Sequence, residues 1–192
     1  MGIWFPDAMA LTLKVEHLKG NAKQLERALK SKTPAVYVGI PAATAEQRAS
    51  EILSMAANAS GRQRKRLRRM ATQDVNNAEL LFIFSKGSPV RNQPPRPVLE
   101  PAVEFPANRK IITRELAGMM KAHLKGDKQQ ESSFAHRAAM AGQNAARDWF
   151  TNPENHWAPN APSTIRQKGS DRPGIDTGAM RAAIVGIVKE AE

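Results

Sequence analysis

The sequence predicts an α+β fold in which several helices pack on a small β-sheet. Apolar and polar residues alternate at Leu11–Val15 and at Val36–Ile40, as in half-buried strands. A β-rich segment at Ile184–Lys189 follows near the end of the chain. The stretches between these segments repeat apolar residues at the spacing of amphipathic helices. Because helical segments separate the strands, we expect distant parts of one domain, covering residues 1–192, to form the sheet.

Two helices with one apolar face each are predicted in the first part of the chain. The first begins near Leu18 and ends near Lys32, and the second begins at Ala45. Their faces consist of Leu18, Ala22, Leu25 and Leu29 in the first and Ala49, Ile52, Leu53 and Ala56 in the second. The second helix leads into a strongly basic run at Arg62–Arg69. Its charges would surround a helix and leave no apolar face, so we expect a solvated helix or a disordered loop.

The middle of the chain combines a proline-rich loop with two longer predicted helices. A short apolar element at Asn77–Phe84 precedes a loop with prolines at positions 89, 94, 95 and 97, which predict a stiff, extended arm. The helix faces that follow are Ile112, Leu116, Met119, Met120 and His123, ending near Gly126, and then Phe134, Ala138, Ala141, Ala145 and Trp149. The second face is mostly alanine, so that helix can approach a neighbour closely.

The last part of the chain is a loop at Thr151–Gly174 that contains one short predicted helix. Pro162 stands at its start and Gly169 just past its end, where these residues are favoured. After the loop, either Asp176 or Thr177 is expected to cap the turn at Gly178–Arg181 by accepting a backbone N–H.

Composition limits the partners and the chemistry of the chain. Its 29 basic and 18 acidic residues give a formal charge of +11, which favours an anionic partner. The absence of cysteine excludes disulfides and thiolate chemistry. No apolar run approaches the ~20 residues that span a bilayer. The first residues lack the pattern of a signal peptide, so we expect synthesis in the cytoplasm and no membrane partner.

The sequence predicts neither an enzyme nor a cofactor or metal site. The tripeptide Asp176-Thr177-Gly178 matches an aspartic-protease signature, but only 14 residues follow it, too few for the rest of such a lobe. The four histidines have no metal-ligand spacing, and no glycine-rich phosphate loop occurs. His123, on an apolar helix face, is expected to be a core or interface residue.

The basic run is the strongest candidate for a binding surface. It consists of Arg62, Arg64, Lys65, Arg66, Arg68 and Arg69. No base-reading motif or aromatic platform accompanies it, so any contact to DNA would be independent of base sequence. Three interpretations remain open at this point: contact with nucleic acid, contact with an acidic neighbouring subunit, or a solvated face with no partner.

Two strings resemble those of a known family. They are Pro94-Pro95-Arg96-Pro97-Val98-Leu99-Glu100-Pro101-Ala102 and the segment from Pro162 to Ile184, which contains Thr164-Ile165-Arg166-Gln167-Lys168 and Ile175-Asp176-Thr177-Gly178. In this order they resemble the head–tail joining (neck, tail-completion) proteins of long-tailed bacteriophages and prophages. Those proteins have an R-P-F-L-x-P-A string followed by T-I-x-x-K and I-D-T-G-x-L-x-x-S-I. Val98, Met180 and Ala183 depart from the pattern, and the basic region at about 45–75 is an insertion relative to shorter members.

The resemblance implies a structural virion protein that forms a homo-oligomeric ring, usually sixfold, in the phage neck. Such a ring joins the DNA-filled head to the tail. Its partners would be the portal-side connector or head-completion protein, the tail terminator or tail tube protein, and packaged double-stranded DNA. The alternative from another class is a freestanding, sequence-independent nucleic-acid-binding protein that uses residues 62–69.

Physical reasoning assigns candidate interface roles within the two strings. Arg96 beside Pro97 in the stiff arm could bind a neighbouring carboxylate in bidentate fashion, or it could fix its own loop through a salt bridge. Trp157 is a packing residue or an interface anchor. The remaining residues assigned to a subunit interface or a structural motif are Leu99, Asp176, Thr177 and Gly178.

Overall fold

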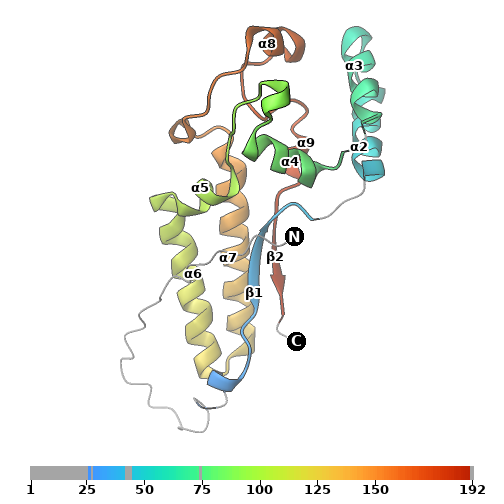
Figure 1. The fold of residues 1–192 in the computed structure, drawn as a ribbon. Helices are drawn as coiled ribbons and strands as arrows, with labels where there is room; N and C mark the ends of the chain where they lie inside the picture. Colours follow the sequence, from blue (N-terminus) through green and yellow to red (C-terminus); the bar gives the residue numbers. More distant parts are fainter. Residues whose placement is uncertain (1–25, 27, 42–44, 74, 191–192) are drawn as a thin grey trace.

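The computed structural model describes residues 26, 28–41, 45–73 and 75–190, and Figure 1 shows its architecture. The elements follow in the order β1 (Ala35–Gly39), α2 (Ala45–Ala57), α3 (Gly61–Ala71), α4 (Asn77–Lys86), η1 (Pro89–Arg91), α5 (Leu99–Glu104), α6 (Pro106–Lys125), α7 (Lys128–Trp149), η2 (Pro153–Asn155), α8 (Pro162–Lys168), α9 (Ala179–Ala182) and β2 (Val185–Lys189). The predicted α+β class is confirmed: the described residues are mostly helical and contain one small antiparallel sheet.

The long helices α6 and α7 form the body of the molecule as an antiparallel pair (Figure 1). Pro106 begins α6 and Gly126 ends it in the left-handed conformation, with φ of 74°. Asp127 then caps α7 by accepting a hydrogen bond from the Gln130 backbone N–H at 3.0 Å. These start and stop signals agree with the helix boundary predicted near Gly126.

The sheet pairs the two ends of the described chain and packs against α7 (Figure 1). Strand β1 runs antiparallel to β2, with Ala35 opposite Lys189 and Gly39 opposite Val185. Both strands lie where the alternation at Val36–Ile40 and the segment at Ile184–Lys189 predicted them. The predicted strand at Leu11–Val15 and most of the predicted helix after it lie outside the described residues.

Small residues on α7 let the sheet approach this helix closely. The predicted alanine-rich face is confirmed, since Ala138 and Ala145 are buried, and Gly142 is buried beside them. The backbone of Gly186 in β2 passes directly over Ala139: a Cβ on Gly186 would come within 3.0 Å of the backbone of that residue. A residue with a Cβ atom does not fit at position 186 at this distance between β2 and α7, so the packing requires glycine.

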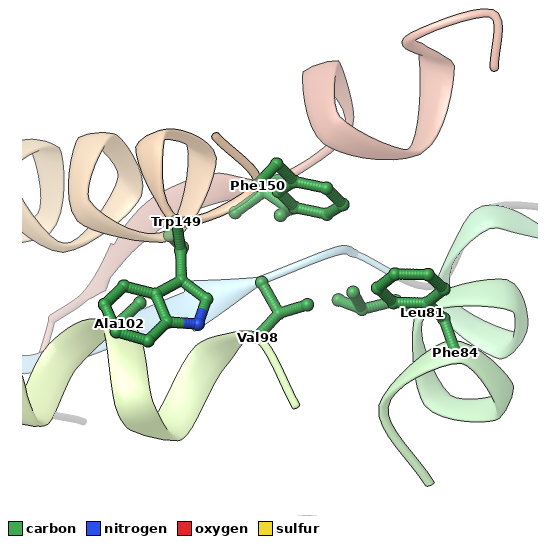
Figure 2. Close-up of a cluster of buried hydrophobic side chains, with 8 residues drawn as sticks. Leu81, Phe84, Val98, Ala102, Trp149 and Phe150 are labelled. Carbon is green, nitrogen blue, oxygen red and sulfur yellow. The ribbon is translucent and has the colours of Figure 1, made fainter. Parts of the chain in front are cut away.

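The main core lies where α4, α5 and the end of α7 converge (Figure 2). Trp149 and Phe150 from α7 meet Val98 beside α5 and Phe84 on α4. The Phe84 and Phe150 rings stack with centroids 6.1 Å apart. Aromatic residues therefore carry much of this core, although they are scarce in the chain. The two sides of the proline-rich loop are held together by this cluster.

A separate small core joins α2 to α3. It consists of Ile52 and Ala56 from α2 and Leu67 from α3, all less than 5% exposed. The predicted α2 face is thus correct for Ile52 and Ala56, but Leu53 is 49% exposed. A similar difference occurs just before β1, where Leu29 is 72% exposed and Ala28 is buried instead. In both helices the tertiary contacts select a narrower face than the apolar periodicity indicated.

Candidate nucleic-acid and assembly surfaces

The basic run forms helix α3, which folds back on α2 as a helical hairpin beside the body of the molecule (Figure 1). No apolar face was predicted here from the sequence, and this prediction is wrong. Leu67 is only 4% exposed, and Met70 and Ala71 also pack against α2. These three residues are enough to fix which side of α3 faces inward. The charged side chains are thereby directed to the other sides.

Five of the six cations of the run are exposed, and Arg66 is partly buried. The helical spacing of about 100° per residue places Arg62, Lys65 and Arg69 on the side opposite Leu67, with Arg68 at the edge of that side. Within the described part of the chain, none of these four side chains has an acceptor. We call them the outer face of α3. These four cations lie on one side of the helix without a partner among the described residues, so they repel each other. An anionic ligand would reduce this electrostatic repulsion.

The other two cations of α3 have partners in the chain. Arg64 Nε donates to the Ala59 carbonyl at 2.7 Å, which closes the turn between α2 and α3. Arg66 donates to the Gln167 carbonyl at 3.3 Å and forms an ion pair with Asp176. Arg66 therefore fastens α3 to the segment that contains α8 and α9.

These contacts correct the role expected of Asp176 in the Asp-Thr-Gly motif. Thr177, not Asp176, accepts a backbone hydrogen bond, from the Ala179 N–H at 3.2 Å. The N-cap of α9 is Gly178, which has φ of 81° and no side chain to offer. Asp176 is thus free to pair with Arg66, which is 110 residues earlier in the chain.

We predict that Asp176→Asn loosens the attachment of the α2–α3 hairpin. The Arg66–Asp176 pair is partly exposed, so its loss is expected to lower the free energy of unfolding by only about 1 kcal/mol. The position of α3 should change more than the stability. The chain has no cysteine, so spin labels at Gln63→Cys and Ser163→Cys report the distance between α3 and α8 specifically.

The expected result is a broader distance distribution in the Asp176→Asn protein. Asp171→Asn is the matched control, because Asp171 is an exposed carboxylate in the same loop that forms no ion pair with α3 among the described residues. An unchanged distribution in the Asp176→Asn protein would show that the ion pair does not hold the hairpin.

The proline arm folds onto its own chain. Arg96 is 6% exposed, and its guanidinium donates to the Ala158 carbonyl at 2.8 and 3.1 Å and to the Pro159 carbonyl at 3.1 Å. Burial lowers the pKa of Arg96 from its usual value. A carboxylate partner was predicted for Arg96, either in a neighbouring subunit or in the same chain. The partners are backbone carbonyls instead. The loop that contains them has no regular structure, so Arg96 supplies the donors that a helix or a sheet would otherwise provide.

Trp157 completes this junction from the other side. Its Nε1 donates to the Pro97 carbonyl at 3.1 Å, and its ring meets Phe84 and Phe150 edge-on at 5.2 and 5.6 Å. These contacts agree with the packing role of Trp157 and leave the interface role as a prediction. Leu99 packs partly buried against the main core, while Pro97 is exposed.

A buried ionic cluster was only partly predicted from the sequence. His123 was expected in the core or in an interface, and it is 4% exposed. Its Nδ1 lies 2.7 Å from Glu131 Oε1, and its Nε2 lies 2.9 Å from the Ala28 carbonyl. Lys128 Nζ lies 2.8 Å from Glu131 Oε2. Glu131 gave no sequence signal of its own, although it stands eight residues after His123 across the α6–α7 turn.

The Glu131 carboxylate is held in its charged form. Burial by itself raises its pKa, but hydrogen bonds from Lys128 and His123 and their positive charges outweigh this effect. The pKa of Glu131 therefore lies below its usual value. Both ring nitrogens of His123 face acceptor oxygens, and Nε2 also lies 3.2 Å from the Ser31 hydroxyl. The cluster ties the residues before β1 to the α6–α7 turn.

No group of three or more His, Asp or Glu side chains among the described residues is arranged to hold a metal ion. Among the same residues, no helix is long and apolar enough to cross a lipid bilayer.

Comparison with protein-family models, with curated proteins and with solved structures finds no match to this chain.

Proposed function

We propose that this chain is a structural subunit of the neck of a tailed-phage particle, where a ring of copies joins the DNA-filled head to the tail. The proposal starts from the two strings that resemble head–tail joining proteins. The observation that supports it best is the junction of Arg96, Pro97 and Trp157. Arg96 in the first string bonds the Ala158 carbonyl, 62 residues later, just before the second string. A shared fold would require these strings to form one structural unit.

Exposed apolar side chains supply surface for contacts between copies. Tyr37 and Ile187 are directly opposite each other in the sheet, on its side away from α7, and they are 54% and 39% exposed. Phe82 on α4 is 60% exposed, and Val90 in η1 is 98% exposed. Large apolar side chains of this kind are common in protein interfaces. The partners proposed for the ring are the portal-side connector or head-completion protein and the tail terminator or tail tube protein.

The test is made in the host that carries the gene. Deleting the gene is expected to leave DNA-filled heads and free tails that do not join, and a plasmid copy is expected to restore joining. Cryo-electron microscopy of labelled particles should then place the subunit at the head–tail junction. Complete particles that lack this polypeptide would overturn the proposal.

A freestanding nucleic-acid-binding protein is the second candidate, because the outer face of α3 has no partner among the described residues. Mass photometry of the purified chain discriminates between the two. The neck subunit is expected to form discrete rings alone or on a connector. A protein that binds DNA tightly at physiological salt, and forms no ring under either condition, favours the second candidate.

A further inference from the structure

The surplus positive charge of the chain is concentrated in two segments that meet in space. Helix α3 and residues 162–176 together carry nine basic and two acidic side chains. They therefore hold seven of the eleven surplus charges of the whole chain. The rest of the chain is nearly balanced for its length. A general tendency toward basic residues would spread the surplus more evenly, so the concentration calls for a local cause.

Arg66 joins these two segments into one surface. It bonds the Gln167 carbonyl at the end of α8 and pairs with Asp176, so its side chain links α3 to the α8 segment, and both helices lie at the same end of the molecule (Figure 1). The α8 segment adds the exposed side chains of Arg166 and Arg172. Arg166 and Arg172 could not be grouped with the basic run from the sequence, because they are about a hundred residues from α3.

Lys168 in α8 lies close to charged groups of both segments. Burial is the main cause that lowers the pKa of Lys168, and the positive charges of Arg66 and Arg96 add to it against the opposing effects of Asp176 and Asp171. Lys168 Nζ donates to the Arg172 carbonyl at 2.8 Å, which fixes the loop that presents Arg172. Contacts inside the chain thus fix Arg66, Lys168 and the backbone that carries Arg172, whereas the exposed cations of this end pair with no acidic side chain of the described residues.

We propose that the outer face of α3, together with Arg166 and Arg172, binds the phosphate backbone of duplex DNA without reading its base sequence. The outer-face cations recur along the helix over about 10 Å at 1.5 Å per residue, which suits a repeating row of charges. Neither α3 nor residues 162–176 contain an aromatic residue, so the surface offers nothing on which unpaired bases could stack. These features favour a duplex over single strands.

The inference deepens the proposed neck function, in which packaged DNA passes the ring, but its test does not depend on that function. The affinity of purified full-length chain for DNA is measured without particles or partners. If the DNA contact fails, heads and tails can still require the subunit for joining. If the neck proposal fails, the purified chain can still bind DNA through this surface.

The experiment compares two quadruple variants that carry the same net charge. In the first, Arg62, Lys65, Arg68 and Arg69 are replaced by glutamine. In the matched control, glutamine replaces four exposed lysines outside the basic end, namely Lys30, Lys110, Lys121 and Lys189. Fluorescence anisotropy with a 30-base-pair duplex between 50 and 200 mM salt gives the affinity and its salt dependence.

Six phosphate contacts predict a slope of log K against log salt of about −5 for the wild-type chain. The outer-face variant is expected to reduce the slope to about −2 and to bind about a hundredfold more weakly at 0.1 M salt. The control is expected to keep a slope near the wild-type value. Arg166→Gln with Arg172→Gln should reduce the slope by about 2 units, which tests the contribution of α8 separately.

Three outcomes would overturn the inference. Equal losses in the outer-face variant and the control would show that net charge alone, and no built surface, attracts DNA. If the wild-type chain does not bind the duplex at 50 mM salt, duplex DNA is not the ligand of this surface. If polyglutamate competes as effectively as unlabelled duplex at equal charge, the result would indicate an acidic protein partner instead. Circular dichroism of each variant verifies that it remains folded.

Discussion

Replacing Gly186 by alanine is expected to destabilise the protein by roughly 2–4 kcal/mol, a large effect for a single added methyl group. The new Cβ would lie within 3.0 Å of the Ala139 carbonyl oxygen, carbonyl carbon and Cα in α7. These are backbone atoms inside a long helix, and they cannot rotate away as a side chain can. Strand β2 must therefore move off α7, which disturbs its pairing with β1. Urea unfolding followed by circular dichroism measures the loss.

Two other glycines in the same layer provide controls for this prediction. A Cβ on Gly39, which is opposite Val185 in the sheet, would have no atom within 4 Å, so Gly39→Ala should be neutral or slightly stabilising. A Cβ on Gly142 would meet only the Val38 side chain, chiefly its Cγ2 at 2.5 Å, so Gly142→Ala should fall between the two. Equal stabilities of the Gly186 and Gly39 variants would show that β2 is not packed on α7 at the distance described.

Strong local patterns explain why much of the fold could be predicted from the sequence. The apolar faces of α6 and α7 extend over many turns, and Gly126 and Asp127 separate them with well-defined stop and start signals. Alternation at Val36–Ile40 likewise identified β1. In these segments the local preference and the tertiary contacts agree, so the pattern alone is sufficient.

The prediction failed where a single residue or a distant partner decides the structure. Leu67 is the one buried side chain of α3, with Met70 and Ala71 partly buried beside it, and this short apolar face is outnumbered by six cations in the same segment. Arg66 and Asp176 are 110 residues apart, so no local spacing links them. Arg96 bonds backbone carbonyls, and every residue has a carbonyl, so the sequence cannot indicate which one is chosen. The α3 part of the proposed DNA-binding surface could therefore be predicted from the sequence, and the α8 part could not.

Replacing His123 by alanine is expected to lower the free energy of unfolding by about 3 kcal/mol. The substitution removes both the Glu131 contact and the bond to the Ala28 carbonyl, and it leaves a carboxylate that is 2% exposed with Lys128 as its remaining partner. A buried charge that has lost a partner costs more than the original pair contributed. Urea unfolding at pH 7 measures the effect.

His136→Ala is the matched control, because His136 is exposed on the outer side of α7 and bonds only within its own helix. It should change the stability by less than about 0.5 kcal/mol. If both histidine variants unfold at the same urea concentration, the buried cluster does not contribute to stability as described.

The same cluster predicts part of the acid sensitivity of the protein, and the sign follows from the lowered pKa of Glu131. A carboxyl group whose pKa is lower in the folded state stabilises the fold above its unfolded pKa, about 4.3 for glutamate, and this contribution disappears as the pH falls through the folded value. Glu131→Gln cannot lose a proton in either state. Its stability should therefore fall less steeply than that of the wild type between pH 5 and the acid range, even though it is less stable at pH 7. Parallel curves for the two proteins would show that Glu131 has the same pKa folded and unfolded, and that the ion pair with His123 and Lys128 does not stabilise its charge.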